Sequence, residues 1–250
     1  MEAKNDRSAW LKGPSFACEV LPDHIERPWR LVLLGAPGVG KGTQAELLSE
    51  RLGACHLSTG DVFRVAKCLA EGERSPSMSA ALEYMRRGEL VPDGTVLEMV
   101  RERAGCLRCR GGFLLDGFPR TVAQAEALQV ILREQNVALD AALSYELSIE
   151  EIVARLSGRR ICEGCKAVYH VVGRPPKTDG VCDQCGSPLV QREDDRPETV
   201  RVRLAAYEKS TAPVTDFYRQ LGLLRPVAVG ALAEQTLERT MTVLQNAGRT

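Results

Sequence analysis

Short apolar segments alternate along the chain with longer segments in which apolar residues recur every three or four positions. The short segments have the length of buried strands, and the longer ones have the period of amphipathic helices. Strands that alternate with helices in this way are typical of an α/β protein with a parallel sheet between layers of helices. The five predicted strands are residues 30–35, 54–57, 112–116, 141–147 and 225–229.

The helical segments carry start signals of their own. Thr121 with Gln124, and Ser148 with Glu151, have the spacing of capping boxes, and Pro197 suits the first turn of a helix. Pro213 falls inside the last long periodic segment, where we expect it to kink the helix. The helical apolar positions are Ala45, Leu48 and Leu52, then Val122, Ala125, Leu128 and Leu132, then Val200, Leu204, Tyr207, Thr211, Val214 and Phe217.

Two segments interrupt the alternation. Residues 59–91 form a mostly helical insertion after the second predicted strand, and residues 158–195 form an insertion punctuated by Cys, Gly and Pro. Residues 1–28 mix acidic and basic side chains without an apolar segment, which predicts a polar extension rather than a signal or transit peptide. The remaining segments, 29–58, 92–157 and 196–250, are expected to build one core.

Composition narrows the class of protein. A chain of 250 residues that is 44% hydrophobic can bury one substantial core with room for small inserted modules. Its 33 Lys and Arg balance its 33 Asp and Glu, so no net charge recruits nucleic acid or anionic lipid. No apolar run approaches the roughly 18 residues of a membrane span. We therefore expect neither nucleic acid nor membrane as partner. Nine cysteines, four of them in two CxxC pairs, suit a reducing compartment, so the expected location is the cytoplasm. We also expect a monomer.

A glycine-rich segment from Gly35 to Thr43 follows the first predicted strand and opens a helix. Backbone N–H groups of such a turn converge on an anion, and the positive end of the helix adds to the attraction. Lys41 has the position of the lysine that reaches the outer phosphates, but Gly42 stands where Ser or Thr usually binds Mg²⁺. The alternative, a flexible turn beside a solvated lysine, fits the flanking strand and helix less well.

Four cysteines form two CxxC pairs separated by sixteen residues, which is the spacing of a tetrahedral zinc site. Four thiolate ligands leave no open position for water, so the metal is predicted to be structural. The module has fewer than forty residues, and we expect metal binding to supply the free energy for its folding. The alternatives are free thiols or two disulfides. The predicted ligands are Cys162, Cys165, Cys182 and Cys185.

Cys106 and Cys109 form a third CxxC pair without a partner pair in sequence. Cys55 or Cys68 would have to complete a second metal site with them. The interpretation we favour is that these thiols are reduced and bind no metal.

Three further motifs follow the phosphate loop in a fixed order: STGDVFR at 58–64, GFLLDGFPRT at 112–121, and Asp194-Asp195 with Arg203. Together with the phosphate loop and the cysteine pairs, they resemble the adenylate kinases, in particular the zinc-containing bacterial form. The resemblance runs from about residue 30 to 245. It implies a P-loop kinase core, a nucleoside monophosphate-binding insertion at 59–91 and a zinc-binding lid at 158–195. Taken singly, Asp116 could cap a helix and Arg120 could be a surface cation.

The resemblance implies two nucleotide sites. Gln124 would read the adenine edge of AMP, although its place in a capping box is a competing explanation. The segment from Gly230 to Leu232 aligns only loosely with the family's C-terminal adenine contact. The implied ATP site consists of Gly38, Val39, Gly40, Lys41, Gly42, Thr43, Arg155, Arg159, Val168, Tyr169 and Leu232. The implied AMP site consists of Thr59, Gly60, Arg64, Glu89, Leu90, Val91, Gly117, Phe118, Pro119, Arg120, Gln124, Arg192 and Arg203.

The implied reaction is Mg²⁺-dependent phosphoryl transfer between ATP and AMP. The protein catalyses such a transfer by aligning the two nucleotides and neutralising the charge of their phosphates. The residues that would do so are Lys41, Arg120, Arg159, Arg192, Arg203 and Asp116. Asp116 would hold Mg²⁺ through water molecules, which explains why the loop can have Gly42 in place of the usual Ser or Thr ligand. The three histidines, His24, His56 and His170, do not form a nucleophile with a base, so we expect direct in-line transfer.

Closure of the two insertions over the substrates would exclude water. Asp194 and Asp195 are predicted to lie at the hinge or in ion pairs of the closed state, and the alternative is a solvated acidic turn. Two other functions stay open at this point. One is a kinase for GMP, UMP or CMP, and the other is a non-catalytic module whose zinc ribbon binds nucleic acid.

Overall fold

The computed structural model describes residues 27–68, 76–87, 89, 91–165 and 167–247. Nearly all of the predicted extension at 1–28 lies outside them. The central sheet has five parallel strands in the order β2-β3-β1-β4-β8. The strands are β1 (Trp29–Leu34), β2 (Cys55–Ser58), β3 (Gly112–Asp116), β4 (Ala141–Glu146) and β8 (Leu224–Ala228). The α/β class and the five predicted strands are confirmed, with ends that differ by at most one residue.

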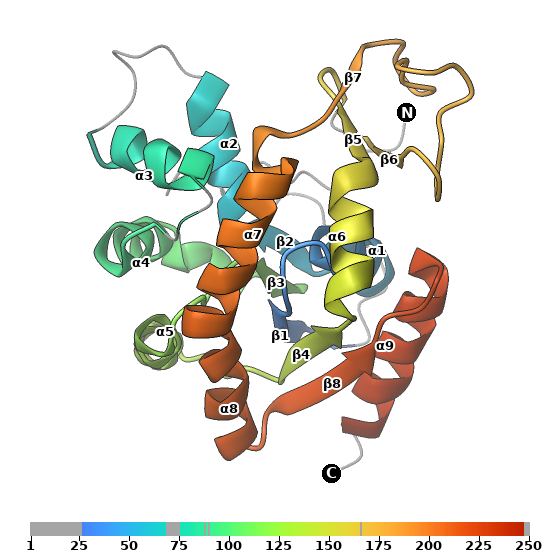
Figure 1. The fold of residues 1–250 in the computed structure, drawn as a ribbon. Helices are drawn as coiled ribbons and strands as arrows, with labels where there is room; N and C mark the ends of the chain where they lie inside the picture. The colour runs from blue at the N-terminus through green and yellow to red at the C-terminus, as the bar shows by residue number, and fades with distance from the viewer. Residues whose placement is uncertain (1–26, 69–75, 88, 90, 166, 248–250) are drawn as a thin grey trace.

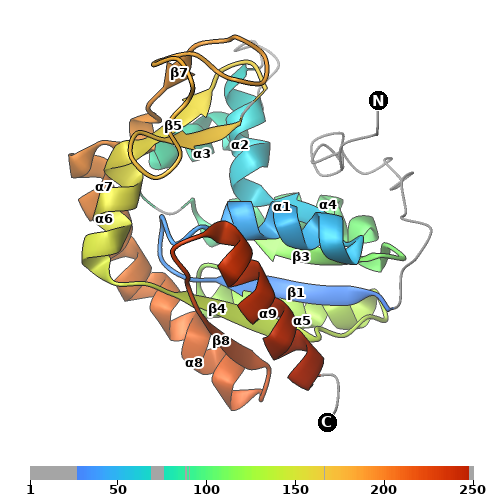
Figure 2. The same ribbon diagram turned by 90° about the vertical axis from the view of Figure 1, so that its right-hand side faces the viewer.

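Alternate side chains of each strand pack on opposite faces of the sheet. Leu31 and Leu33 contact one apolar cluster, whereas Val32 and Leu34 contact the other. The first face is covered by α1 (Lys41–Leu52), α6 (Ile149–Gly158) and α9 (Ala233–Ala247); α1 and α9 lie in front of the sheet in Figure 2. The second face is covered by α4 (Asp93–Glu102), α5 (Val122–Glu134) and α8 (Ala212–Gln220).

Two groups of elements extend from the same end of this core (Figure 1). One consists of α2 (Thr59–Cys68) and α3 (Pro76–Arg87). The other is an antiparallel sheet in the order β6-β5-β7, with β5 (Arg159–Cys162), β6 (Val168–His170) and β7 (Leu189–Val190). Short 3₁₀ helices cover Ala104–Arg108 and Glu193–Asp195. None of the described helices is long and apolar enough to cross a membrane.

The predicted helix starts are confirmed. Thr121 accepts a hydrogen bond from the backbone N–H of Gln124 (3.1 Å), and Ser148 accepts one from that of Glu151 (3.3 Å). Pro197 lies in the first turn of α7 (Pro197–Ala206). These caps satisfy backbone donors that have no partner inside the helix.

The long helix near Pro213 is irregular, as predicted, and the irregularity is a π-helical turn over Tyr207–Thr211 between α7 and α8. Pro213 has no N–H to donate to the preceding turn, and a wider turn accommodates its ring. Beyond this turn the predicted Val214 is buried. On the same face, Tyr218 is fully buried, whereas the predicted Phe217 is only partly buried.

Candidate active site

A cavity of about 470 Å³ lies at the carboxyl ends of β1, β2 and β3. This is the edge at which parallel α/β sheets bind ligands, because the loops that follow the strands meet there. The cavity is bordered by residues of the glycine-rich loop, of both groups of elements that extend from the core, and of α7. Its volume lies within the range of small-molecule sites.

The glycine-rich loop runs so close to its neighbours that side chains would not fit. A Cβ atom at Gly35 would lie 2.6 Å from the Tyr145 carbonyl oxygen, and one at Gly38 would lie 2.8 Å from Leu156 Cγ. Both glycines have positive φ angles, of +135° and +89°, which side chains disfavour. The loop leads directly into the N-terminus of α1 at Lys41.

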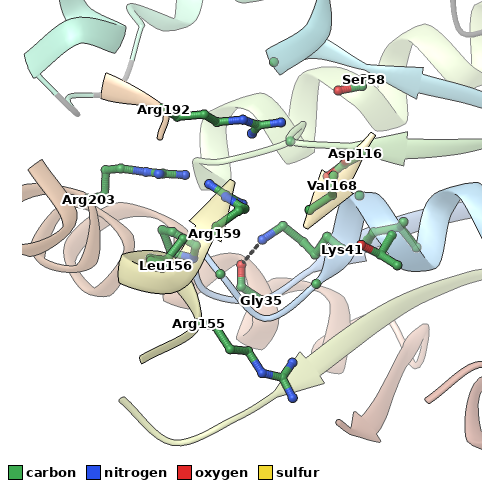
Figure 3. Close-up of a pocket in the computed structure, with 18 of the residues that line it drawn as sticks. Gly35, Lys41, Ser58, Asp116, Arg155, Leu156, Arg159, Val168, Arg192 and Arg203 are labelled. Atoms are coloured by element: carbon green, nitrogen blue, oxygen red, sulfur yellow. Dashed lines mark hydrogen bonds between the residues drawn. The ribbon is translucent and has the colours of Figure 1, made fainter. Parts of the chain in front are cut away.

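Lys41 lies folded back over this loop. Its Nζ donates hydrogen bonds to the carbonyl oxygens of Gly35 (2.6 Å) and Ala36 (3.0 Å), and Figure 3 shows the first of them. The pKa of Lys41 is lowered from 10.5 to about 8. Burial is the main cause, and nearby arginines act in the same direction, whereas Asp116 acts in the opposite one. A lysine in this state is a compact cation poised to exchange carbonyl oxygens for those of an anion.

Four predicted arginines line the same cavity from three parts of the chain. Arg120 follows β3, and Arg159 is the first residue of β5. Arg192 lies in the segment before α7, and Arg203 lies within α7. In Figure 3 the side chains of Arg159, Arg192 and Arg203 extend toward the region of Lys41. Such a concentration of guanidinium groups suits an anion with several phosphates, because each planar group binds two phosphate oxygens.

Asp195 holds two of these arginines. Its fully buried carboxylate accepts hydrogen bonds from Arg159 through Nε (2.6 Å) and Nη2, and Arg203 Nη1 lies 3.4 Å from Oδ1. The predicted ion pairs of Asp195 are therefore present, and the alternative of a solvated turn is wrong for this residue. The side chain of Asp194 lies outside the described part of the chain.

Asp116 ends β3 and faces the phosphate loop. A Cβ atom at Gly42 would lie 3.6 Å from its Oδ2 atom, so the glycine leaves the space beside the carboxylate open. His56 Nε2 lies 3.4 Å from the same oxygen, and His56 is buried. Sequence reasoning considered His56 only as a catalytic base and missed this contact. No local motif signals this contact, because it arises from strand pairing: Ser58 pairs with Asp116, and His56 lies two residues before Ser58 on the same face of β2.

The predicted AMP residues separate into two groups. Gly60, Glu89, Gly117, Pro119, Arg120, Arg192 and Arg203 line the cavity. Thr59 donates to the Gly117 carbonyl oxygen (3.0 Å) behind the cavity wall, and Val91 and Phe118 are buried in the core. Leu90 and the side chain of Arg64 lie outside the described residues.

Gln124 is not among the residues that line the cavity. It is buried and belongs to a partly buried polar network. Its side-chain oxygen accepts from the Arg120 N–H (2.7 Å), and its Nε2 donates to Asp93 Oδ1 (2.7 Å). Thr121 Oγ1 donates to the other oxygen of Asp93 (2.8 Å). The network fixes the backbone of Arg120, and the predicted contact of Gln124 with adenine stays a prediction. Asp93 was missed because it lies 28 residues from Thr121 in sequence.

The predicted ATP residues of the loop, apart from the buried Val39, line the cavity together with Val168 and Tyr169. Arg155 also lines it, but Figure 3 shows its guanidinium group directed away from the other arginines. It donates to the Gly230 carbonyl oxygen (3.1 Å). Ala231 lines the cavity beside this contact, whereas the predicted Leu232 is 58% exposed and does not.

The four lid cysteines form one cluster in which all sulfur atoms lie within 4.8 Å of one another. Cys162 and Cys185 are 3.3 Å apart, and Cys165 and Cys182 are 3.5 Å apart. These separations exceed a disulfide bond of about 2.05 Å, and all four cysteines are free thiols. Hydrogen bonds with the side chain and backbone of Ser187 lower the pKa of Cys185 to about 6. The arrangement can hold a metal ion, and the alternative of two disulfides is not observed.

Within the described residues, this cluster is the single group of three or more potential metal ligands. Cys55, Cys106 and Cys109 do not form a second one. The side chain of Cys68, which was considered as a further ligand, lies outside the described part of the chain.

The glycine-rich loop at the edge of a parallel sheet and the cationic cavity beside it define the class of the protein. It is a P-loop phosphotransferase that acts on nucleotides, because both features serve to bind and transfer phosphate.

Comparisons with known proteins identify the family. The family model for adenylate kinase matches residues 33–223. An adenylate kinase of Ruminiclostridium cellulolyticum is 46% identical over 215 residues, which cover 86% of this chain and 99% of the relative. One of Caldicellulosiruptor bescii is 50% identical over 88% of this chain and 99% of the relative, and one of Archaeoglobus fulgidus is 49% identical over 79% and 89%. The chain belongs to the adenylate kinase family.

Proposed function

We propose that this protein transfers the terminal phosphoryl group of ATP to AMP and forms two molecules of ADP, reversibly and by direct in-line displacement. The observation that carries the proposal is the convergence of Lys41 and four arginines on one cavity beside a phosphate loop. Membership of the adenylate kinase family supports the choice of substrates.

On the donor side, the backbone N–H groups of the loop from Gly38 to Thr43 bind the phosphates of ATP. Lys41 gives up its hydrogen bonds to Gly35 and Ala36 and binds the phosphoryl group that is transferred. The adenine of ATP lies near Arg155 and Ala231, which border the cavity where the loop before α9 meets α6.

On the acceptor side, Gly60, Glu89 and Gly117 border the space for AMP. Arg120 binds its phosphate, and the network of Gln124 and Asp93 holds the Arg120 backbone in place. Arg64 and Gln124 are further proposed AMP contacts.

Charge develops on the phosphoryl oxygens during transfer, and the arginines neutralise it. Arg159 and Arg203 are held by Asp195, so their orientation is set before the substrates bind. Arg192 completes the set from the segment before α7. No covalent intermediate is needed, since Lys41 and the arginines align donor and acceptor.

Two metal ions fit the residues present. Asp116, with the open space left by Gly42, would hold Mg²⁺ through water molecules. Bound Mg²⁺ neutralises the phosphates of ATP. Zn²⁺ suits Cys162, Cys165, Cys182 and Cys185, because four thiolates at these separations can surround one tetrahedral ion. Its role there is structural.

The elements at 59–91 and 158–195 act as an AMP-binding insertion and a lid that close over the cavity. Closure excludes water and prevents the hydrolysis of ATP. We propose ATP and AMP as the partners of a cytoplasmic monomer that binds neither nucleic acid nor membrane.

The proposal is tested by measuring ADP formation from ATP and Mg²⁺ with AMP, GMP, UMP or CMP as the acceptor. The expected result is the highest kcat/KM with AMP. A higher kcat/KM with GMP, UMP or CMP would assign the protein to another nucleoside monophosphate kinase. Absence of activity with all four acceptors would favour a non-catalytic nucleotide-dependent module.

A further inference from the structure

Two cysteines outside the lid lie unusually close together. The sulfur atoms of Cys55 and Cys109 are 2.9 Å apart. The closest sulfur pairs of the lid, which are near enough to share one metal ion, are 3.3 and 3.5 Å apart. A disulfide bond of about 2.05 Å would require these two sulfur atoms to move by less than 1 Å.

The fold holds both cysteines in this position. Cys55 is the first residue of β2 and pairs with Phe113 in β3. Cys109 precedes β3, and the N–H of Gly112 donates to its carbonyl oxygen (2.9 Å) in a tight turn. The turn folds Cys109 back beside the start of β2. Strand pairing and the turn thus hold the two sulfur atoms next to each other.

The surroundings favour oxidation over metal binding. The described residues offer no third metal ligand next to the pair. Cys55 and Cys109 are partly exposed, so a small oxidant can reach them. Cys106, the other member of the CxxC pair, is buried, and burial raises the pKa of its thiol. A higher pKa leaves less of the reactive thiolate.

We propose that Cys55 and Cys109 form a disulfide when a peroxide is present. One thiolate attacks a peroxide oxygen, the O–O bond breaks, and the sulfur becomes a sulfenic acid as the first water leaves. The second thiol attacks that sulfur, the S–S bond forms, and the sulfenic oxygen leaves as the second water. Two thiols and one hydrogen peroxide give one disulfide and two waters.

The disulfide would close the segment that contains α2, α3 and α4. It lies at the amino end of β2, whereas the cavity lies toward the carboxyl end, where His56 and Ser58 border it. We therefore expect the turnover number to be unchanged. The link spans 54 positions, and closing a loop of that length in the unfolded chain raises the melting temperature by about 10 °C.

Trypsin separates the three cysteines, because cleavage after Arg51, Arg64, Arg103, Arg108 and Arg110 places each in its own peptide. Cys55 lies in 52–64, Cys106 in 104–108 and Cys109 in 109–110. The zinc-loaded protein is treated with hydrogen peroxide, alkylated, digested without reduction and analysed by mass spectrometry. The expected product is 52–64 linked to 109–110, in the unaltered chain and in Cys106→Ser, but not in Cys55→Ser.

A link between 104–108 and 109–110 would overturn the proposal, as would alkylation of Cys55 and Cys109 after the lid thiols have been oxidised. Melting temperature is the second measurement. It should rise on oxidation, fall again with dithiothreitol, and stay constant in Cys55→Ser and Cys109→Ser. A linked peptide without any rise would contradict the expected effect on the loop.

Discussion

Lys41 is buried and lies near several arginines, and its loss of a proton can be followed in the pH dependence of the reaction rate. The pKa of Lys41 is lowered from 10.5 to about 8, mainly by burial, with smaller contributions in the same direction from Arg120, Arg203 and Arg159 and an opposing one from Asp116. Loss of its proton removes the cation that binds phosphate. We therefore expect kcat/KM for ATP to fall as pH rises through about 8, since this ratio reports groups of the free enzyme.

Lys41→Arg is the matched variant for this prediction. Arginine keeps its charge at every working pH, so its lower activity should lack the decline near pH 8. A wild-type profile that stays level through this range, or an equal decline in Lys41→Arg, would contradict the role of Lys41.

Substitution of Arg203 tests whether the arginines act on the phosphates. The Arg203 side chain is about one-fifth exposed, on α7, and is held by Asp195. We predict that Arg203→Ala lowers kcat by about 10²- to 10³-fold, as loss of a transition-state contact does, while the melting temperature changes little. Arg201→Ala is the control, because Arg201 is an exposed arginine of the same helix. Equal kcat in the two variants would show that Arg203 does not act on the phosphates.

The sequence predicts the site residues whose chemistry depends on local spacing. Lys41 and Asp116 could be found because each lies in a recognisable motif, Lys41 after β1 and Asp116 at the end of β3. His56 and Asp93 could not, since their roles come from neighbours 60 and 28 positions away. The same holds for Gln124, whose side-chain amide contacts Asp93 and the Arg120 backbone.

Among the elements, the small antiparallel sheet depends most on its proposed metal. The apolar cluster that holds it together consists of Cys162, Tyr169 and Cys182, with Ala167 and Leu189 packed against them. So small a core cannot offset the entropy of folding by itself. We predict that removal of Zn²⁺ by a chelator makes 158–195 sensitive to trypsin, while the central sheet stays resistant.

Re-addition of Zn²⁺ should restore the resistance, and Cys165→Ser should be sensitive from the start. If the chelated protein resists digestion at 158–195 as well as the untreated protein does, zinc is not what holds the lid.

Strands and helices differ in how far the sequence predicts them. Most residues of β1, β3 and β4 are buried, so these strands appear as mainly apolar runs in the sequence. The edge strand β8 has a single buried residue, and its run is interrupted by Arg225 and Pro226. The helix after Pro197 keeps its apolar spacing in sequence, but a π turn interrupts it at Tyr207–Thr211. Periodicity predicts a regular helix and does not reveal where the helix widens.

At the scale of the whole molecule, the site exists because distant segments meet at one edge of the sheet. Asp195 contacts Arg159, which lies 36 positions earlier in the sequence, and Arg155 contacts Gly230, which lies 75 positions later. The motifs predict which residues take part, whereas the contacts between them follow from the packing of α6, α7 and the loop before α9. For this reason the sequence did not distinguish Ala231 from Leu232 at the cavity wall.

The central claim is that Lys41 and the arginines align two nucleotides for direct phosphoryl transfer. It is tested most directly with ATP that carries a label in its γ-phosphoryl group, mixed with AMP, Mg²⁺ and purified protein. The account predicts that the label moves to the β-phosphoryl group of newly formed ADP, with two ADP made per AMP consumed and no label on the protein. Label released as inorganic phosphate, or bound covalently to the protein during turnover, would contradict it.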